Sequence, residues 1–254
     1  MCRHVAYLGP AATLRSVIMD PPHGLYRQAW APRRQRHGTV NADGFGVGWY
    51  APGDPDPARY RRAEPIWGDE SFADVARVTM SSAVLGAVRC ATAGTAPGPA
   101  SVAPFAAGRW LFSHNGAIDG WPSAAAGLAA TLPASALLGL EARVDSALLW
   151  ALVRHRLDLG LPPAGALADT IGTLRAAGVT GRFNFLLTDG RVIAATAAGD
   201  TLWHRVSERA VVVASEPGDD EPGWTEVPDG SAVTATARDL QVTGLTSDER
   251  IAIP

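Results

Sequence analysis

The sequence contains no lysine, and its 22 residues of fixed positive charge are all arginine. This absence excludes a Schiff-base lysine and a P-loop lysine, together with the chemistry that depends on either. Charged residues make up only 19% of the chain. The net charge of -3 and an isoelectric point near 6.1 argue against nucleic acid as the main partner. The one basic cluster, Arg33, Arg34, Arg36 and His37, is predicted to lie in a solvated loop.

Cysteine is also scarce, since Cys2 and Cys90 are the only two. They allow one disulfide at most and form no metal-binding cluster, so we expect neither a metal nor a cofactor. No apolar run is long enough to span a bilayer and the start of the chain lacks a signal-peptide pattern, which predicts a cytoplasmic protein without membrane contact. With 47% hydrophobic residues the composition is globular, and we interpret residues 1–254 as one domain.

Hydrophobic patterning predicts an α+β protein with many strands and few helices. Strands are expected at about 2–8, 44–49, 84–94, 110–113, 182–188, 191–197, 201–206, 210–215 and 231–237. Helices are expected at about 13–20, 71–80, 122–131, from 143, and 162–177, and a surface hairpin loop at 51–59. The late strands are predicted to form a meander of antiparallel hairpins. Several of them are apolar on both faces, which predicts a four-layer α/β/β/α sandwich of two antiparallel sheets, with the amino terminus at its centre.

Cys2 directly follows the initiator methionine and opens the first predicted strand. Removal of Met1 would place a thiol and a free α-amino group on one carbon. The thiolate is the reactive form of cysteine, and an adjacent amine near its own pKa serves as the base. From its position alone, an incidental buried cysteine remains the alternative.

Arg89 stands inside a predicted apolar strand, where an unpaired charge is costly. Two interpretations stay open: a clamp on a substrate carboxylate, for which the guanidinium fork is well shaped, or an internal ion pair. Because neighbouring strand residues face opposite ways, Cys90 is expected to point away from Arg89, and a disulfide with Cys2 is not expected.

Asn115-Gly116 has two interpretations as well, while Asp145 has a structural one. Asn-Gly is the commonest tight-turn dipeptide, but an asparagine amide and an unshielded glycine N–H could also donate to a developing oxyanion. Asp145 lies at the predicted start of a helix, where aspartate is a preferred N-cap. Likewise, the glycines of residues 44–48 indicate either tight packing or close approach of a ligand.

Taken in order, these segments resemble the class II glutamine amidotransferases of the N-terminal-nucleophile hydrolase superfamily, and within them the stand-alone branch of ergothioneine biosynthesis. The resemblance covers nearly the whole chain. The matching segments are residues 1–3 (MCR), 41–50 (NADGFGVGWY), 88–94 (VRCATAG), 113–116 (SHNG), 145–146 (DS) and 214–217 (ASEP). The resemblance implies an amidohydrolase that cleaves the γ-glutamyl amide of a small molecule through a thioester on Cys2, with oxyanion stabilisation by Asn115 and Gly116.

The same resemblance implies the substrate contacts: Arg89 and Thr92 on the α-carboxylate, Asp145 on the α-ammonium, and His114 in the substrate site. Cys90, where many relatives carry an aromatic residue, and Ala93, where some carry histidine, depart from the pattern and leave the outer pocket wall open. No synthase domain follows in the sequence, so we expect a plain hydrolase without an obligatory synthase partner. A glutaminase subunit that supplies ammonia to a separate synthase, and a non-catalytic protein that kept the fold, are the alternatives.

Overall fold

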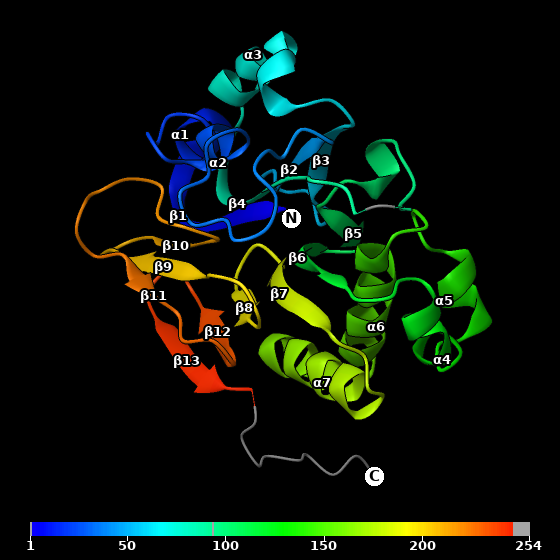
Figure 1. Ribbon diagram of the computed structural model, residues 1–254. Helices are drawn as coiled ribbons and strands as arrows, with labels where there is room; N and C mark the ends of the chain where they lie inside the picture. Colours follow the sequence, from blue (N-terminus) through cyan, green and yellow to red (C-terminus); the bar gives the residue numbers. More distant parts are fainter. Residues whose placement is uncertain (1, 93, 246–254) are drawn as a thin grey trace.

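The computed structural model describes residues 2–92 and 94–245, which form two antiparallel sheets stacked face to face. Helices cover the outer face of each sheet, with α1–α3 on one side and α6–α7 on the other (Figure 1). The predicted α/β/β/α sandwich is therefore confirmed. Strands that are buried on both faces require such layering, because one face packs on the other sheet and the opposite face packs on helices.

The first sheet holds the strand that follows Cys2 at its centre. Its order is β11-β9-β10-β1-β4-β2-β3. These strands are β1 (Arg3–Thr13), β2 (Phe45–Trp49), β3 (Ala58–Arg62), β4 (Met80–Val88), β9 (Trp203–Val206), β10 (Val211–Ala214) and β11 (Thr225–Glu226). Because β1 pairs with β10 on one side and β4 on the other, Cys2 enters the middle of the fold, as predicted.

The second sheet has the order β13-β12-β8-β7-β6-β5. Its strands are β5 (Phe105–Ala107), β6 (Trp110–Ile118), β7 (Gly181–Thr188), β8 (Ile193–Ala197), β12 (Ser231–Ala235) and β13 (Leu240–Gly244). After β8 the chain crosses to the first sheet for β9–β11 and then returns for β12. The predicted single meander is therefore wrong, because strands that are apolar on both faces fit either sheet and turn residues do not reveal which one they join.

Short helices cover the first sheet and two long helices cover the second. The first group is α1 (Leu14–Ile18), α2 (Leu25–Gln28) and α3 (Glu70–Val78), and the long pair is α6 (Asp145–Asp158) and α7 (Pro163–Ala176). The remaining short helices lie in connecting segments: α4 (Ala126–Ala129), α5 (Ala134–Leu138) and the 3-10 turns η1 (Ile66–Gly68), η2 (Pro99–Ser101) and η3 (Ser123–Ala125). Within residues 2–92 and 94–245, no helix has the length and apolar character needed to cross a membrane.

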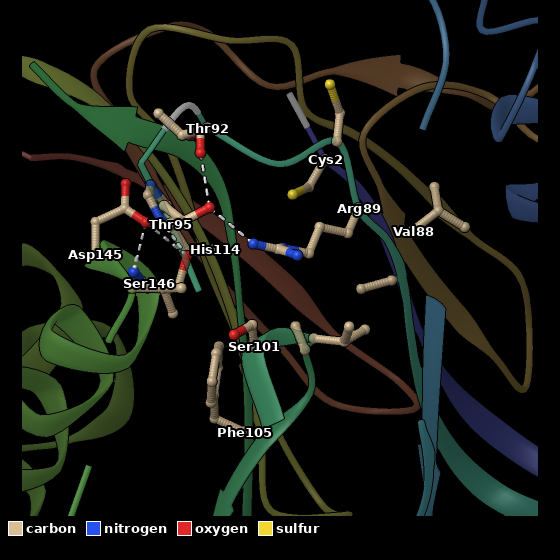
Figure 2. Close-up of a pocket in the computed structure, with 16 residues that line it drawn as sticks. Cys2, Val88, Arg89, Thr92, Thr95, Ser101, Phe105, His114, Asp145 and Ser146 are labelled. Carbon is tan, nitrogen blue, oxygen red and sulfur yellow. Dashed lines mark hydrogen bonds between the residues drawn. The ribbon is translucent and has the colours of Figure 1, made fainter. Parts of the chain in front are cut away.

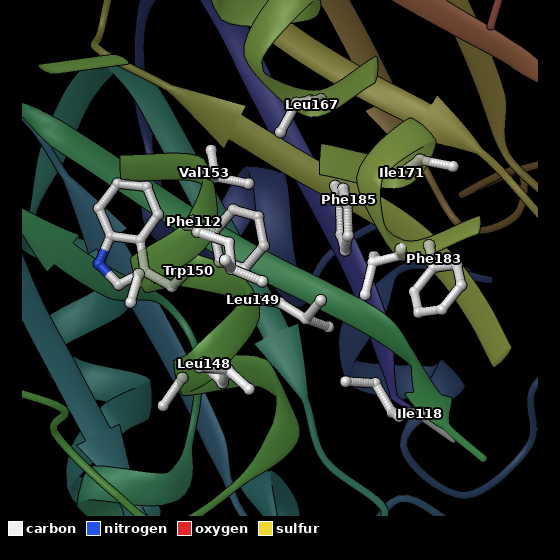
Figure 3. Packing of buried hydrophobic residues seen from close by; sticks show 14 of the residues in the cluster. Phe112, Ile118, Leu148, Leu149, Trp150, Val153, Leu167, Ile171, Phe183 and Phe185 are labelled. Carbon is white, nitrogen blue, oxygen red and sulfur yellow. The ribbon is translucent and has the colours of Figure 1, made fainter. Parts of the chain in front are cut away.

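Apolar side chains fill the space between the two sheets and the space between the second sheet and its helices. Between the sheets, Leu85, Leu111 and Leu186 are fully buried. Between the second sheet and α6, the rings of Phe112 and Trp150 stack with centroids 5.3 Å apart (Figure 3). Stacked aromatic pairs add to burial, so β6 is held firmly on both faces.

Several predicted strand ends differ from the structure. β1 continues past Gly9 and Pro10 to Thr13 with a register shift, and β4 ends at Val88 instead of running to residue 94. β6 continues to Ile118, so the tight-turn interpretation of Asn115-Gly116 is wrong. The sequence also missed β3, which falls partly in the expected loop at 51–59, together with β5, β11 and β13.

Candidate active site

One cavity lies where the start of β1, the end of β4, β6 and the start of α6 meet (Figure 2). Six of the seven predicted site residues line it: Cys2, Arg89, Thr92, His114, Gly116 and Asp145. The cavity is also lined by residues that the sequence did not single out, among them Thr95, Ser101, Phe105 and Ser146.

Cys2 immediately precedes the central strand β1 and is half-buried in the cavity wall. Burial raises the pKa of its thiol, while the backbone N–H of Cys90, which donates to the sulfur, and the nearby charge of Arg89 act in the opposite direction. A thiol with a raised pKa needs a nearby base to become a nucleophile. Met1 lies outside the described residues, so its removal stays a prediction.

Arg89 is the first residue after β4, and it is only 9% exposed. Its Nη2 donates to Thr95 Oγ1 at 2.9 Å and to the carbonyl oxygen of Ala96 at 3.4 Å, and its Nη1 donates to the carbonyl oxygen of Asp43 at 3.4 Å. All three acceptors are neutral. No carboxylate among the described residues lies within 4.0 Å of this guanidinium, so the internal ion pair is not present there.

The segment around Arg89 is held by the Gly-rich segment before β2. The backbone N–H of Arg89 donates to the Gly44 carbonyl, and the Asp43 N–H donates to the Arg89 carbonyl. The Asp43 carboxylate accepts the N–H of Ala91 at 2.8 Å. A Cβ at Gly46 would lie 2.2 Å from the carbonyl oxygen of Ala103, so packing against the chain itself accounts for this glycine.

Cys90 lines the same cavity as Arg89, contrary to the expected alternation. The alternation fails because β4 ends at Val88 and the next residues are not in a strand. Both Cys2 and Cys90 are free thiols.

His114 and Asp145 form a connected polar group on the α6 side of the cavity (Figure 2). His114 Nε2 lies 2.9 Å from the Arg182 carbonyl oxygen and must carry the hydrogen, so Nδ1 accepts from Ser146 Oγ at 3.0 Å. Burial lowers the pKa of His114, which keeps the ring neutral.

Asp145 is the first residue of α6 and is 5% exposed. The N-cap position belongs to Val144, so the N-cap interpretation is wrong. The Asp145 carboxylate instead accepts the N–H of Ser146 at 2.8 Å and that of Ile118 at 3.1 Å, joining α6 to the end of β6. Among the described residues no cation lies within 4.0 Å of it, which leaves a buried carboxylate available for a cationic ligand.

Gly116 and Asn115 are neighbours on β6 with different surroundings. A Cβ at Gly116 would lie 1.9 Å from the carbonyl oxygen of Arg182, so only glycine fits where β6 faces the cavity. Asn115 is the one predicted site residue that the structure does not bring to the cavity wall. Its side chain is fully buried, and Nδ2 donates to Asp200 Oδ2 at 3.2 Å.

The sequence analysis did not predict Thr95 and Ser146 as site residues, because no periodic sequence pattern indicates that their side chains face the cavity. Thr95 lies in a Gly- and Pro-rich loop, where no pattern shows which side chains turn inward. Ser146 follows Asp145 directly, and its hydroxyl faces the cavity only because α6 begins there.

The layered sandwich, with a cysteine at the head of its central strand and a cavity that pairs this cysteine with a buried guanidinium and a buried carboxylate, defines an N-terminal-nucleophile type of hydrolase fold. Comparisons with known proteins agree. The chain belongs to the class-II glutamine amidotransferases, whose family matches residues 24–208.

Two relatives align along almost the whole chain. The gamma-glutamyl-hercynylcysteine sulfoxide hydrolase of Mycolicibacterium smegmatis is 43% identical over 246 residues, covering 96% of this chain and 100% of the relative. The solved structure of a glutamine aminotransferase class-II domain protein from Silicibacter pomeroyi has a TM-score of 0.71 and 27% identity, covering 96% of this chain and 100% of that chain.

A third comparison shows the fold alone. The glutamine phosphoribosylpyrophosphate amidotransferase of B. subtilis has a TM-score of 0.68 at 15% identity, covering 97% of this chain and 50% of that chain.

Proposed function

We propose that this protein hydrolyses the γ-glutamyl amide bond of a small molecule and releases glutamate. The observation that carries the proposal is the charge pattern of the cavity. Beside Cys2 lie a buried guanidinium whose partners among the described residues are neutral and a buried carboxylate without a cation. A glutamyl group carries a carboxylate, an ammonium and a scissile carbonyl. The guanidinium of the cavity is complementary to the substrate carboxylate, and the carboxylate of the cavity is complementary to the substrate ammonium.

The chemistry begins at the sulfur of Cys2. The thiolate attacks the γ-carbonyl carbon, a C–S bond forms, and the carbonyl oxygen becomes an oxyanion that Asn115 and the N–H of Gly116 stabilise. The tetrahedral species then breaks its C–N bond, and the α-amino group of Cys2 passes the thiol proton to the departing amine. Water adds to the thioester, the C–S bond breaks, and glutamate leaves with the cysteine restored.

Substrate contacts follow from the cavity wall. Arg89, aided by Thr92 at the mouth, binds the α-carboxylate, and Asp145 binds the α-ammonium. His114 has both ring nitrogens engaged, so it contributes its ring to the wall and holds Ser146 beside the ammonium site.

The substrate we propose is γ-glutamyl-hercynylcysteine sulfoxide. The M. smegmatis relative is named as a hydrolase of this compound. This assignment places the protein in ergothioneine biosynthesis, in the cytoplasm, with a small-molecule substrate and without an obligatory synthase partner. Identity of 43% over 96% of the chain supports it.

Turnover against a panel of γ-glutamyl compounds tests the function. The panel contains the hercynylcysteine sulfoxide conjugate, the same conjugate without its sulfoxide oxygen, γ-glutamyl-p-nitroanilide and L-glutamine. We expect preference for the sulfoxide conjugate, slow use of glutamine, loss of turnover in Cys2→Ala, and an intact mass that lacks Met1. Preference for glutamine would instead support a glutaminase subunit, and unchanged turnover in Cys2→Ala would disprove nucleophilic catalysis by Cys2.

A further inference from the structure

A buried polar chain connects the strand that follows Cys2 with β6, the strand that carries Asn115 and Gly116. Asp200 Oδ2 accepts a hydrogen bond from Asn115 Nδ2 at 3.2 Å and lies 3.9 Å from Arg3 Nη1. The side chains of Arg3 and Asp200 are fully buried, as is Asn115. The three residues thus link the two sheets directly behind the cavity wall.

Asp200 itself is held rigidly in the crossing from β8 to β9. Its Oδ1 accepts the N–H of Thr201 at 2.8 Å. Its backbone N–H donates to Asn184 Oδ1 at 3.1 Å, and its carbonyl oxygen accepts from Asn184 Nδ2 at 2.9 Å. With the backbone fixed on both sides, the carboxylate has one available direction, toward β6.

Some polar atoms of these three residues have no hydrogen-bond partner, although a network that served only stability would be expected to pair them. Among the described residues, Asn115 Oδ1 and both Nη atoms of Arg3 are buried without a hydrogen-bond partner. Buried polar groups without partners cost free energy, and a half-satisfied network stabilises a fold less than an apolar core. Stability therefore does not account for this arrangement.

An ionised carboxylate is an acceptor only, so it selects between the two orientations of an asparagine amide. Facing Asp200, Asn115 must present Nδ2, and the amide nitrogen then keeps a second hydrogen for another acceptor. In the flipped orientation, Oδ1 would face the carboxylate and a second oxygen would take the place of the donor. Arg3 balances the buried negative charge, which lessens its repulsion of an oxyanion nearby.

We propose that Asp200 is a positioning residue that fixes the side-chain amide of Asn115 with its nitrogen, rather than its oxygen, available to the oxyanion. The inference rests on the proposed function, because it assigns the orientation of one of its oxyanion donors. The amide lies behind the wall and reaches the oxyanion with the hydrogen that Asp200 leaves unused.

Asp200→Asn is the test, since it keeps the shape and removes the selection for one amide orientation. On any panel compound that the wild type cleaves, kcat is expected to fall about 10- to 100-fold with KM nearly unchanged. In an Asn115→Ala background the same change is expected to cost less than about 3-fold, because its effect is transmitted through the missing amide.

A second measurement separates positioning from general damage. Alkylation of Cys2 by iodoacetamide occurs at a saturated carbon and forms no oxyanion, so its rate, followed on the Cys2 peptide by mass spectrometry, should equal that of the wild type. The matched control is Asp229→Asn, which removes a carboxylate that accepts the Gly199 N–H at 2.8 Å in the same crossing but does not contact Asn115. We expect wild-type kcat from this control.

The outcomes are distinct. Wild-type kcat in Asp200→Asn, or an equal loss with and without Asn115, overturns the inference while the proposed function stands. A wild type that cleaves no compound of the panel overturns the proposed function and the inference with it. If Asp200→Asn yields no folded protein, Asp200→Glu, which displaces the carboxylate by one methylene, replaces it. The same steady-state kinetics, Asn115→Ala background and alkylation rate are then measured for this variant.

Discussion

Arg89 Nη2 donates a 2.9 Å hydrogen bond to Oγ1 of Thr95, and this hydroxyl donates in turn to the carbonyl oxygen of Thr92 at 2.7 Å. The bonds close the loop after β4 back onto its own arginine. The guanidinium consequently points across the cavity, toward the side where Asp145 and Ser146 lie (Figure 2). Thr95 thus orients the guanidinium of Arg89, which we propose binds the substrate carboxylate.

Replacement Thr95→Val is expected to raise KM about 5- to 10-fold with little change in kcat. The valine removes one hydrogen bond to a charged group, and the arginine then samples other directions before substrate binds. Steady-state kinetics on the best panel substrate measures the effect. Thr180→Val, at an exposed hydroxyl bonded to Asp119, is the control, and equal KM values in the two variants would contradict this role.

Arg89→Lys should lower kcat/KM about 100-fold, although the positive charge is kept. A lysine ammonium is a point charge and cannot form the paired, parallel hydrogen bonds of a guanidinium with a carboxylate. The loss should shrink for a γ-aminobutyryl amide, which lacks the α-carboxylate. Arg77→Lys, at an exposed position on α3 (Glu70–Val78), serves as control. An equal loss on both substrates would show that Arg89 does not bind the carboxylate.

Gly116→Ala should abolish turnover and destabilise the fold. Its Cβ would lie 1.9 Å from the Arg182 carbonyl oxygen and 2.6 Å from His114 Nε2, so β6 or β7 must shift at the cavity. Gly172→Ala is the matched control, because it lies exposed in α7 with nothing within 4 Å of the added Cβ. This control should gain roughly 0.5–1 kcal/mol, since alanine is the better helix former. Urea unfolding of both variants and an activity assay decide the matter; an active, stable Gly116→Ala would contradict the close approach.

The layered fold was readable from the sequence because its late strands are apolar on both faces, which only a sheet covered on two sides allows. The passage of the chain from the second sheet at β8 (Ile193–Ala197) to the first sheet at β9 (Trp203–Val206) could not be predicted from the sequence. Strands with two apolar faces satisfy either sheet, and pairing over such sequence separations leaves no local signal. The four residues of β10 (Val211–Ala214), for example, would fit beside β12 as well as beside β1.

At the site, residue types indicated the cavity better than the local structure. Asn115-Gly116 has the composition of a turn, yet Asn115 pairs with Asn184 and Gly116 with Phe183 along β7, so the sheet ladder overrides the local preference. The contact of Asn115 with Asp200 joins residues 85 positions apart, and no spacing rule reaches that far. The sequence therefore predicted which residues belong to the site, whereas the orientations of their side chains are determined by tertiary packing.

His4 provides a prediction about stability that is independent of catalysis. It is fully buried on β1, with Nδ1 3.2 Å from Ser113 Oγ and with an Nε2 that has no partner among the described residues. Burial lowers the pKa of His4 to about 3, with smaller electrostatic contributions from His114 and Arg3. A proton on this ring would place a cation, and an unpaired N–H, inside the core.

The sign of the pH dependence follows from this lowered pKa. The unfolded chain binds a proton at His4 below about pH 6.5, but the folded protein does not until about pH 3, so acid favours unfolding across that window. We expect the free energy of unfolding to fall by up to about 1.4 kcal/mol per pH unit from His4 alone as pH drops from 6 toward 4. His4→Gln, whose amide does not titrate, should show a slope shallower by that amount in urea unfolding measured at each pH. Identical slopes in the two proteins would mean that His4 takes up no proton on unfolding, which would contradict a neutral His4 ring in the folded protein.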